Sequence, residues 1–397
     1  MRKIFLLLPF LLLFISCTND DLDGGVVENV GKNEIEEISI QFASSILNIN
    51  GTRSSDGNGL CGNLDVLAVN KIACPAKLTR AAGGECQDTA ITVSFSNAKG
   101  TALLLKNEDN ILPLAFFLNE KGIDLDKELN DSESDLSFLI QQTIAENSGK
   151  VSSVNSFKAE TDLSIVKKIS PKCRVAWHQF DPYNRFCPSS KDGRAVAGCV
   201  AVACAQALTV LQPPIYDANT WEKLINASEW DKDQTAMNQV ASLIRTVGDI
   251  VDTKYSAFGS GVSRKNISKF SRYLSSFDIK DYDCERAIDV LDTEHGVIVI
   301  YGYRAIHGWG PWEHYVDGHA FIADGYIKYN EGKDPYYLHL NYGKYFNDEE
   351  NYKYKKEVYV LSAKKSWKKE EARDFYGEIY PYDLNYYTYA YKNEINR

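Results

Sequence analysis

The run of small apolar residues from Ala197 to Leu208 is the feature of this sequence that most constrains its fold. Alanine, valine and cysteine occupy nearly every position, so a helix here is apolar on all faces and has to be buried on all sides. Pro213 and Pro214 end it. Burying such a helix needs a large core, and 397 residues are enough for about two domains of typical size.

Cys199 lies at the start of this predicted helix, directly after Gly198. The unpaired backbone N–H groups and the positive end of the helix dipole stabilise a thiolate in the first turn, which is what a nucleophilic cysteine needs. A core cysteine that packs like alanine is the competing interpretation. Cys204, farther along the same helix, keeps that second interpretation.

A nucleophilic thiol needs a positioned base, and His319 begins a short strand-like run that ends at Gly325. Strand alternation puts His319 and Phe321 on one face. In the next strand-like run, Tyr337 to Asn341, Asn341 is a candidate to accept from the His319 ring and hold its tautomer.

Other histidines compete with His319 for this role: His307, His314 and His339. His307, His314 and His319 together are also a conceivable zinc site, but no carboxylate-rich partner motif accompanies them. The sequence therefore predicts no metal and no cofactor.

Gln179 lies 20 residues before Cys199, in the stretch Trp177 to Asn184. A glutamine amide near the nucleophile can donate to the oxyanion of a tetrahedral intermediate, together with the Cys199 backbone N–H. An exposed loop glutamine is common, so this residue is a candidate only in combination with the others.

The N-terminus carries an export signal. A short basic start precedes the apolar run Ile4 to Ile15, which is too short to span a bilayer as a mature helix. Cys17 directly follows this run and resembles the lipidated cysteine of a bacterial lipobox; a plain secretory signal with a chance cysteine is the alternative. The acidic start after it, Thr18 to Asp23, is similar to that of surface-exported lipoproteins. We therefore expect an exported outer-membrane lipoprotein that contacts the membrane only through its anchor.

The net charge of -10 argues against nucleic acid as a partner. Export permits disulfides, and Cys61, Cys74 and Cys86 are candidates whose pairing the sequence does not determine. With Cys17 and Cys199 set aside, seven of the nine cysteines remain, so at least one further thiol is free or paired between chains.

Periodicity divides the rest of the chain into two α+β units. Helical spacing behind Asn33, then alternating strands from Ile91 to Leu118 and a helix near Ile140, form a small first unit. A polar, serine-rich stretch from Asn147 to Asp162 follows as the boundary. The second unit begins with helices and continues with strands, which favours segregated α+β.

In this order, the motifs resemble the streptopain family of papain-like cysteine peptidases. Members carry a glutamine before Pro-Tyr-Asn, then Gly-Cys-Val-Ala, Gly-His-Ala-Phe with Asp-Gly behind it, and a strand that ends in Asn-Trp-Gly. Here these appear as follows: Gln179 with Pro182-Tyr183-Asn184, Gly198-Cys199-Val200-Ala201 with Ala205-Gln206, Gly318-His319-Ala320-Phe321 with Asp324-Gly325, and Asn341-Tyr342-Gly343.

The resemblance implies an α+β fold, with a papain-like catalytic domain made of a helical half and an antiparallel sheet, preceded by a small α+β pro-domain that occupies the cleft until it is removed. The expected division is a signal peptide over 1–17, a tether over 18–32, an inhibitory pro-domain over 33–147, a linker or activation segment over 148–169 with a possible cleavage site at Lys167-Lys168, and a peptidase domain over 170–397.

The implied activity is peptide-bond hydrolysis by an endopeptidase zymogen. Cys199 and His319 form the catalytic dyad, Gln179 stabilises the oxyanion, and Asn341 and Tyr342 orient the histidine. Its partners are protein or peptide substrates and its own pro-domain. Tyr342 replaces the family's tryptophan, and Lys344-Tyr345-Phe346 replaces its glycines, so a catalytically impaired relative that acts as a surface binding protein is the alternative. A protein in which the first unit works as an inhibitor is a third.

Overall fold

We describe a computed structural model of the chain. Its description covers residues 27–51, 64–73, 88–118 without 97, 98 and 109, then 140, 143, 144 and 147, then 163–362 without 229–230, 274–277, 282, 303–304, 308–313, 317–318, 331–335 and 342–356, and finally 385–389.

Helix α1 (Val27–Gly51) opens the described chain. Ile38, Phe42 and Ile46 on one of its faces are fully buried, as their spacing predicts. The prediction that Asn33 caps this helix is wrong, because the helix begins six residues earlier and includes the second half of the expected tether. No proline interrupts Val27 to Asn33, and Gly31 inside a helix costs only about 1 kcal/mol.

Four antiparallel strands follow α1, and the helix packs on the last two of them. They pair in chain order, and Glu108 takes the left-handed backbone conformation (φ 49°) in the tight turn between the third and fourth. The strands are β1 (Val66–Ala73), β2 (Thr89–Phe95), β3 (Gly100–Asn107) and β4 (Asn110–Leu118).

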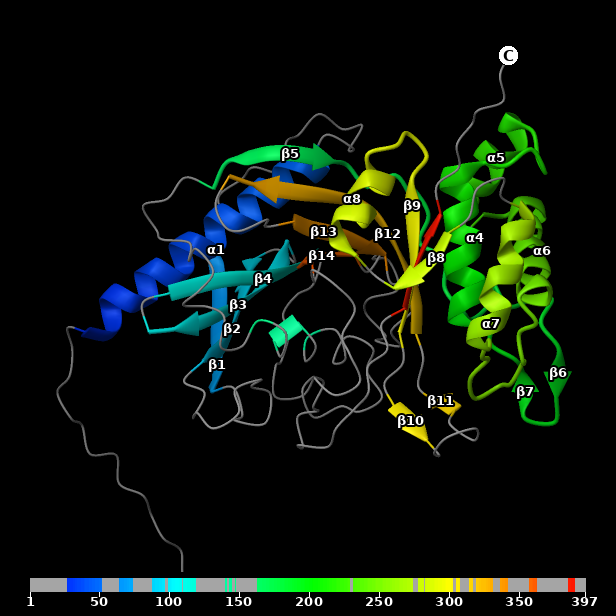
Figure 1. Ribbon diagram of the computed structural model, residues 1–397, viewed down its shortest axis with the longest axis horizontal. Coiled ribbons are helices and arrows are strands. Elements are labelled where there is room, and N and C mark those ends of the chain that lie inside the picture. Colours follow the sequence, from blue (N-terminus) through cyan, green and yellow to red (C-terminus); the bar gives the residue numbers. More distant parts are fainter. Residues whose placement is uncertain are drawn as a thin grey trace, which may run out of the picture.

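The sheet does not stop at the end of the first unit. Strand β4 pairs antiparallel with β14 (Glu357–Leu361), so the order of the described strands runs β1-β2-β3-β4-β14-β13-β12-β9-β15-β8, with β5 also pairing with β12. Figure 1 shows this sheet crossing the molecule, with α1 at one end and the helices of the second unit at the other. The strands not yet bounded are β5 (Ile165–Ile169), β8 (Asp278–Asp281), β9 (Val297–Gly302), β12 (His319–Tyr329), β13 (Tyr336–Asn341) and β15 (Asn385–Tyr389).

The helical half packs on the central strands, with α4 (Cys199–Leu211) directly against β12 and β9. In Figure 1, α5, α6 and α7 lie beyond α4, on the side away from the sheet, and α8 lies next to β9. The remaining elements are α5 (Ala218–Ile225), α6 (Thr235–Ile250), α7 (Arg264–Ile267), a 3-10 turn (Ser268–Tyr273), α8 (Cys284–Leu291) and the hairpins β6/β7 (Ser189–Ser190, Gly193–Arg194) and β10/β11 (Ala305–His307, His314–Val316).

The described residues form two hydrophobic clusters, and one of them contains residues from both units. Phe42 of α1 packs against Tyr329 and Tyr337 of the second unit, with ring centroids 6.1 and 5.1 Å apart. The Tyr337 hydroxyl donates to the carbonyl of Pro113 in β4 at 2.7 Å. The mixed helix and antiparallel-sheet class is therefore as predicted, and the two units share one core across the β4–β14 seam.

The end of the expected linker is part of the sheet. Lys167 and Lys168, the suggested cleavage site, lie in β5, where they pair with Lys328 and Ile327 of β12. A protease that needs an extended, accessible chain cuts such a strand poorly, so the structure argues against this site as the first cut. Residues 148–162, where an earlier cut would fall, all lie outside the described residues.

The shared core predicts that α1 stabilises the second unit as well as the first. Phe42→Ala removes a fully buried ring that touches both units, and should lower the free energy of unfolding of the full chain by about 3–5 kcal/mol, measured by urea denaturation. Leu67→Ala is the control, since Leu67 in β1 is 66% exposed and should change stability little. Equal effects of the two substitutions would contradict the shared core.

Candidate active site

Helix α4 carries Cys199 as its first residue, and every later residue of the helix is buried. Gly198 precedes it with φ at 90°, a conformation that residues with a side chain rarely adopt. No side chain caps the helix start and no acidic residue lies in its first turn. The positive end of the helix dipole lies at this start, which favours negative charge on Cys199.

The chain that leads into α4 is fixed on both sides. The N–H of Ala197 donates to the carbonyl of Gln179 at 2.9 Å, and the Ser260 hydroxyl donates to the carbonyl of Val196 at 2.6 Å. The structure therefore brings Gln179, the candidate oxyanion donor, within two residues of Cys199. Gln179 itself is half-buried.

An extended stretch that we call the Cys173–Gln179 segment runs between the sheet and α4. Its Cys173 N–H donates to Asp324 Oδ2 (2.6 Å) and its Val175 carbonyl accepts from Asn341 Nδ2 (2.9 Å). Asn341 in turn lies opposite Ile322 in β12. The first half of the segment thus follows β12 backwards, from residue 324 towards residue 319.

The same segment also runs backwards along α4. The Trp177 N–H donates to Gln206 Oε1 in the second half of α4 (3.0 Å), and Gln179 contacts Ala197 before its start. The start of α4 and the start of β12 therefore lie at the same end of the segment, that of Gln179. The chain positions of Cys199 and His319 thus lie towards one end of the segment, although the His319 ring stacks on Phe321, which packs in the hydrophobic cluster that does not contain α4.

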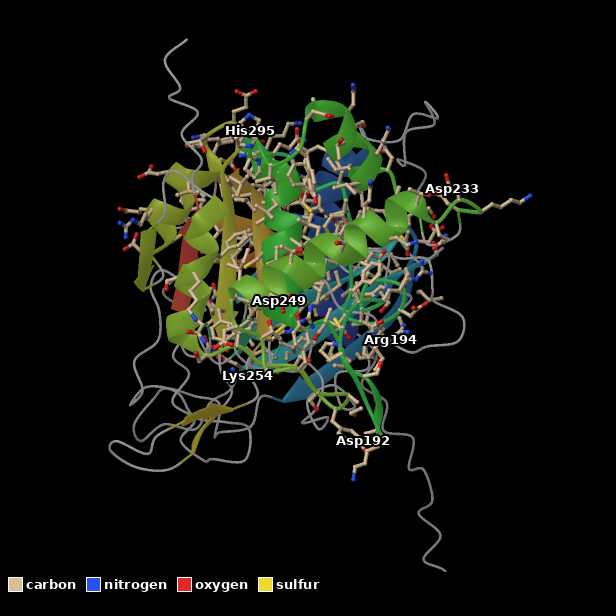
Figure 2. The ribbon with its side chains drawn as sticks, turned by 90° about the vertical axis from the view of Figure 1, so that its right-hand side faces the viewer. Asp192, Arg194, Asp233, Asp249, Lys254 and His295 are labelled. Atoms are coloured by element: carbon tan, nitrogen blue, oxygen red, sulfur yellow. The ribbon has the colours of Figure 1, made fainter. Side chains whose placement is uncertain are left out.

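Figure 2 views the helical side, with α6 crossing in front of α4. The labelled His295 marks the C-terminal end of α4, where its ring nitrogen Nδ1 lies 3.2 Å from the carbonyl of Val210. The labelled Arg194 and Lys254 lie towards the opposite end, at which α4 begins.

His319 is buried, with 7% of its surface exposed, and pairs with Gly302 of β9. Its ring stacks on Phe321, with centroids 5.8 Å apart, as strand alternation predicts. Asn341 lies opposite Ile322 and contacts Val175, on the face towards α4. The orienting role of Asn341 stays a prediction, and Tyr342, the other orienting candidate, lies outside the described residues, as does Cys17.

The other described thiols differ from Cys199, which is half-buried. Burial raises the pKa of the Cys204 thiol far above its usual value and that of Cys187 to about 11, so both stay protonated and unreactive. Cys204 therefore has the environment predicted for a core cysteine. Cys173, Cys187, Cys199, Cys204 and Cys284 are thiols and not halves of a disulfide; the candidate disulfide cysteines Cys61, Cys74 and Cys86 lie outside the described residues.

His339 lies in a buried cluster that the sequence analysis did not foresee. Its Nδ1 is 2.5 Å from Asp324 Oδ1 and its Nε2 is 3.3 Å from Glu357 Oε1. Burial alone would lower the pKa of His339, but the two carboxylates outweigh it and raise the pKa above 6.5. A charged imidazole held between carboxylates is a structural ion pair, so His339 does not compete with His319 as general base.

The register between β12 and β13 explains why the sequence analysis did not foresee this cluster. Asp324 is the extra residue of a β-bulge, between the pairs Ala323–Leu340 and Gly325–His339. A bulge re-aims the side chain, so alternation counted along the sequence fails at this point. In the hairpin β10/β11, His307 lies opposite His314. Among the described residues, no group of three metal-ligating side chains comes together.

Comparison with known proteins assigns this arrangement to a class. The model of the Peptidase C10 family matches residues 177–218 and 215–352. The structure is similar to that of a Prevotella intermedia prointerpain A fragment, with 17% identity, a TM-score of 0.53, and coverage of 77% of this chain and 96% of that one. Active Prevotella intermedia interpain A cysteine protease matches at 23% identity and a TM-score of 0.34 over 51% of this chain and 94% of that one. No curated protein matches the chain.

The family match indicates a cysteine-type peptidase, and the fold is similar to that of the prointerpain A fragment. Residues 177–352 match the model of the Peptidase C10 family, which is the streptopain family. The predicted resemblance is therefore confirmed, and so are the fold class and the enzyme class. The part of the chain that the structure describes contains no helix long and apolar enough to cross a membrane.

The raised pKa of His339 predicts how stability depends on pH. Its contribution is fully present below about pH 6.5, the value in the unfolded chain, and is lost as the pH rises through the higher folded-state pKa. Urea unfolding at a series of pH values should show the wild type losing stability towards high pH relative to His339→Gln, which has no group to titrate there. Parallel pH profiles of the two proteins would contradict this.

Proposed function

We propose that the protein is a lipid-anchored cysteine endopeptidase made as a zymogen, with Cys199 as nucleophile and His319 as general base. The observation that carries the proposal is the course of the Cys173–Gln179 segment, which follows both α4 and β12 backwards towards their starts and ends with Gln179 beside Ala197. The match to the Peptidase C10 family model supports it.

The proposed mechanism uses only side chains and backbone of this chain. His319 takes the proton of the Cys199 thiol, and the sulfur attacks the peptide carbonyl to form an S–C bond. The N–H of Cys199 and the amide of Gln179 donate to the oxyanion that develops. The C–N bond then breaks as His319 returns the proton to the leaving amine. Water, deprotonated by His319, releases the acid and restores the thiol.

Asn341 and Tyr342 complete the proposed site. The Asn341 side chain accepts from the His319 ring and holds its tautomer, and Tyr342 packs where the family carries tryptophan. Residues 33–147 act as the inhibitory pro-domain. Support for this comes from the fold similarity to a prointerpain A fragment, which extends over 77% of the chain.

The pro-domain proposal has a physical consequence. Tyr337 and Tyr359 of the second unit are fully buried in the core shared with α1 and β4. Removal of the first unit would uncover this apolar surface and the paired edge of β14. A single cut in the linker therefore leaves the two units associated, and activation requires the first unit to dissociate or be degraded.

Cys199→Ala tests the nucleophile. It should abolish hydrolysis of a fluorogenic peptide and any self-processing of the full chain, a loss of at least a thousandfold, because the other described thiols, including Cys284 at the start of α8, are buried whereas Cys199 is half-buried. Cys204→Ala is the matched control in the same helix, and should keep activity within a few-fold. Activity retained in Cys199→Ala would refute the assignment.

Cys17→Ser tests the proposed anchor. The wild-type protein made in a Gram-negative host should partition into the detergent phase, since two or three acyl chains bury many CH₂ groups at roughly 0.8 kcal/mol each. The Cys17→Ser protein should partition into the aqueous phase with the same peptidase activity after processing. Aqueous partitioning of the wild type would contradict lipidation.

A further inference from the structure

Side chains, and not strand pairing, hold the Cys173–Gln179 segment in place. Within the described residues it forms no strand and pairs with none, although it passes between β12 and α4. Three buried side chains instead form hydrogen bonds with the backbone of every second residue of the segment. Asp324 binds Cys173, Asn341 binds Val175 and Gln206 binds Trp177. They come from three different elements: β12, β13 and α4.

The spacing of these contacts fixes the direction of the segment as well as its position. Cys173, Val175 and Trp177 are buried, and Arg174 and Ala176 between them are exposed. The alternation ends at Trp177, because His178 is also buried and Gln179 is half-buried. Gln179 follows Trp177 by two residues, and its carbonyl accepts from Ala197, so the three contacts hold the stretch that leads to Gln179.

We propose that Gln206, Asp324 and Asn341 are positioning residues that hold the Cys173–Gln179 segment so that the Gln179 amide reaches the oxyanion at Cys199. This rests on the proposed function. It also gives Asn341 a task beyond the orientation of His319, since its Nδ2 donates to the segment. The Asp324 carboxylate is itself held by His339 at 2.5 Å, which fixes its acceptor atoms.

Gly325 in β12 allows the chain that leads into the segment to lie close to this strand. A Cβ on Gly325 would lie 2.6 Å from the carbonyl oxygen of Ile169 and 3.1 Å from the Cα of Pro171. Only glycine lets the chain between β5 and Cys173 pass this close to β12. Lys172 directly precedes the segment. Its ammonium donates to the carbonyls of Leu291 and Gly296, at 2.7 and 3.1 Å, and so holds the chain where the segment begins.

Gln206 is the sharpest place to test the proposal. It is fully buried in α4, seven residues after Cys199, and its Oε1 accepts from Trp177. Its Nε2 has no hydrogen-bond partner among the described residues. Replacing it by methionine removes an acceptor that Trp177 needs and also an unpaired donor, so the net effect on folding is small while the contact to the segment is lost.

The test compares Gln206→Met with the wild type in the processed enzyme. A loss of the precise placement of Gln179 should lower kcat about ten- to a hundredfold. KM and the rate of Cys199 alkylation by iodoacetamide should stay within about twofold, because alkylation develops no oxyanion. Gln206→Glu keeps the acceptor oxygen for Trp177 and should recover most of kcat. Asn266→Leu is the control for the loss of a buried amide, since its Nδ2 donates to Asp252 at 3.0 Å and not to the segment.

Each other outcome overturns the proposal. An unchanged kcat in Gln206→Met, or an equal fall in kcat and in the alkylation rate, would show that Gln206 does not act through Gln179. If Gln206→Met does not fold, amide exchange of the wild type decides: the Trp177 N–H must exchange slowly, and rapid exchange refutes the contact. Failure of the proposed function looks different, because the wild type itself would then lack activity dependent on Cys199.

Discussion

The packing of α4 against β12 is the constraint on which the rest of this structure depends. The helix has no polar face, so it folds only where a sheet and other helices cover it on all sides. Because β12 supplies that cover, the start of α4 and the start of β12 come to the same end of the molecule, as the contacts of the Cys173–Gln179 segment show. Cys199 and His319 are 120 positions apart in the sequence, yet the packing of α4 on β12 brings the two chain positions to the same end of the molecule.

The first unit is joined to this arrangement by a sheet and a core, and not by a flexible linker alone. Strand β4 pairs with β14, and α1 packs its Phe42 against tyrosines of the second unit. Apolar burial of this kind is the main favourable term in the association of folded units. It explains why a pro-form would be a stable molecule, and why activation would need more than one broken peptide bond.

Much of this was predictable from the sequence. Apolar periodicity identified α1, the run of small apolar residues identified α4, and the strand-like runs after His319 and Tyr337 identified β12 and β13 to within a few residues. The motifs around Cys199 and His319 identified the family, which a match over residues 177–352 confirms. These features are local, and local patterns are what a sequence records directly.

The features that were missed depend on contacts between distant residues. The helix start at Val27 has no capping signal, and the pairing of β4 with β14 joins segments about 240 residues apart. The bulge at Asp324 shifts the alternation of β12, and only then does Asp324 meet both His339 and Cys173. The side-chain support of the Cys173–Gln179 segment leaves no periodic mark at all, because its partners come from three separate elements.

The reactivity of each cysteine in the folded, processed protein tests the central claim most directly. Iodoacetamide labelling followed by peptide mapping gives a rate for each thiol. The account predicts that Cys199 reacts far faster than Cys173, Cys187, Cys204 and Cys284, and that peptidase activity is lost in proportion to its labelling. Protection of Cys199, or its complete labelling without loss of activity, would contradict the account.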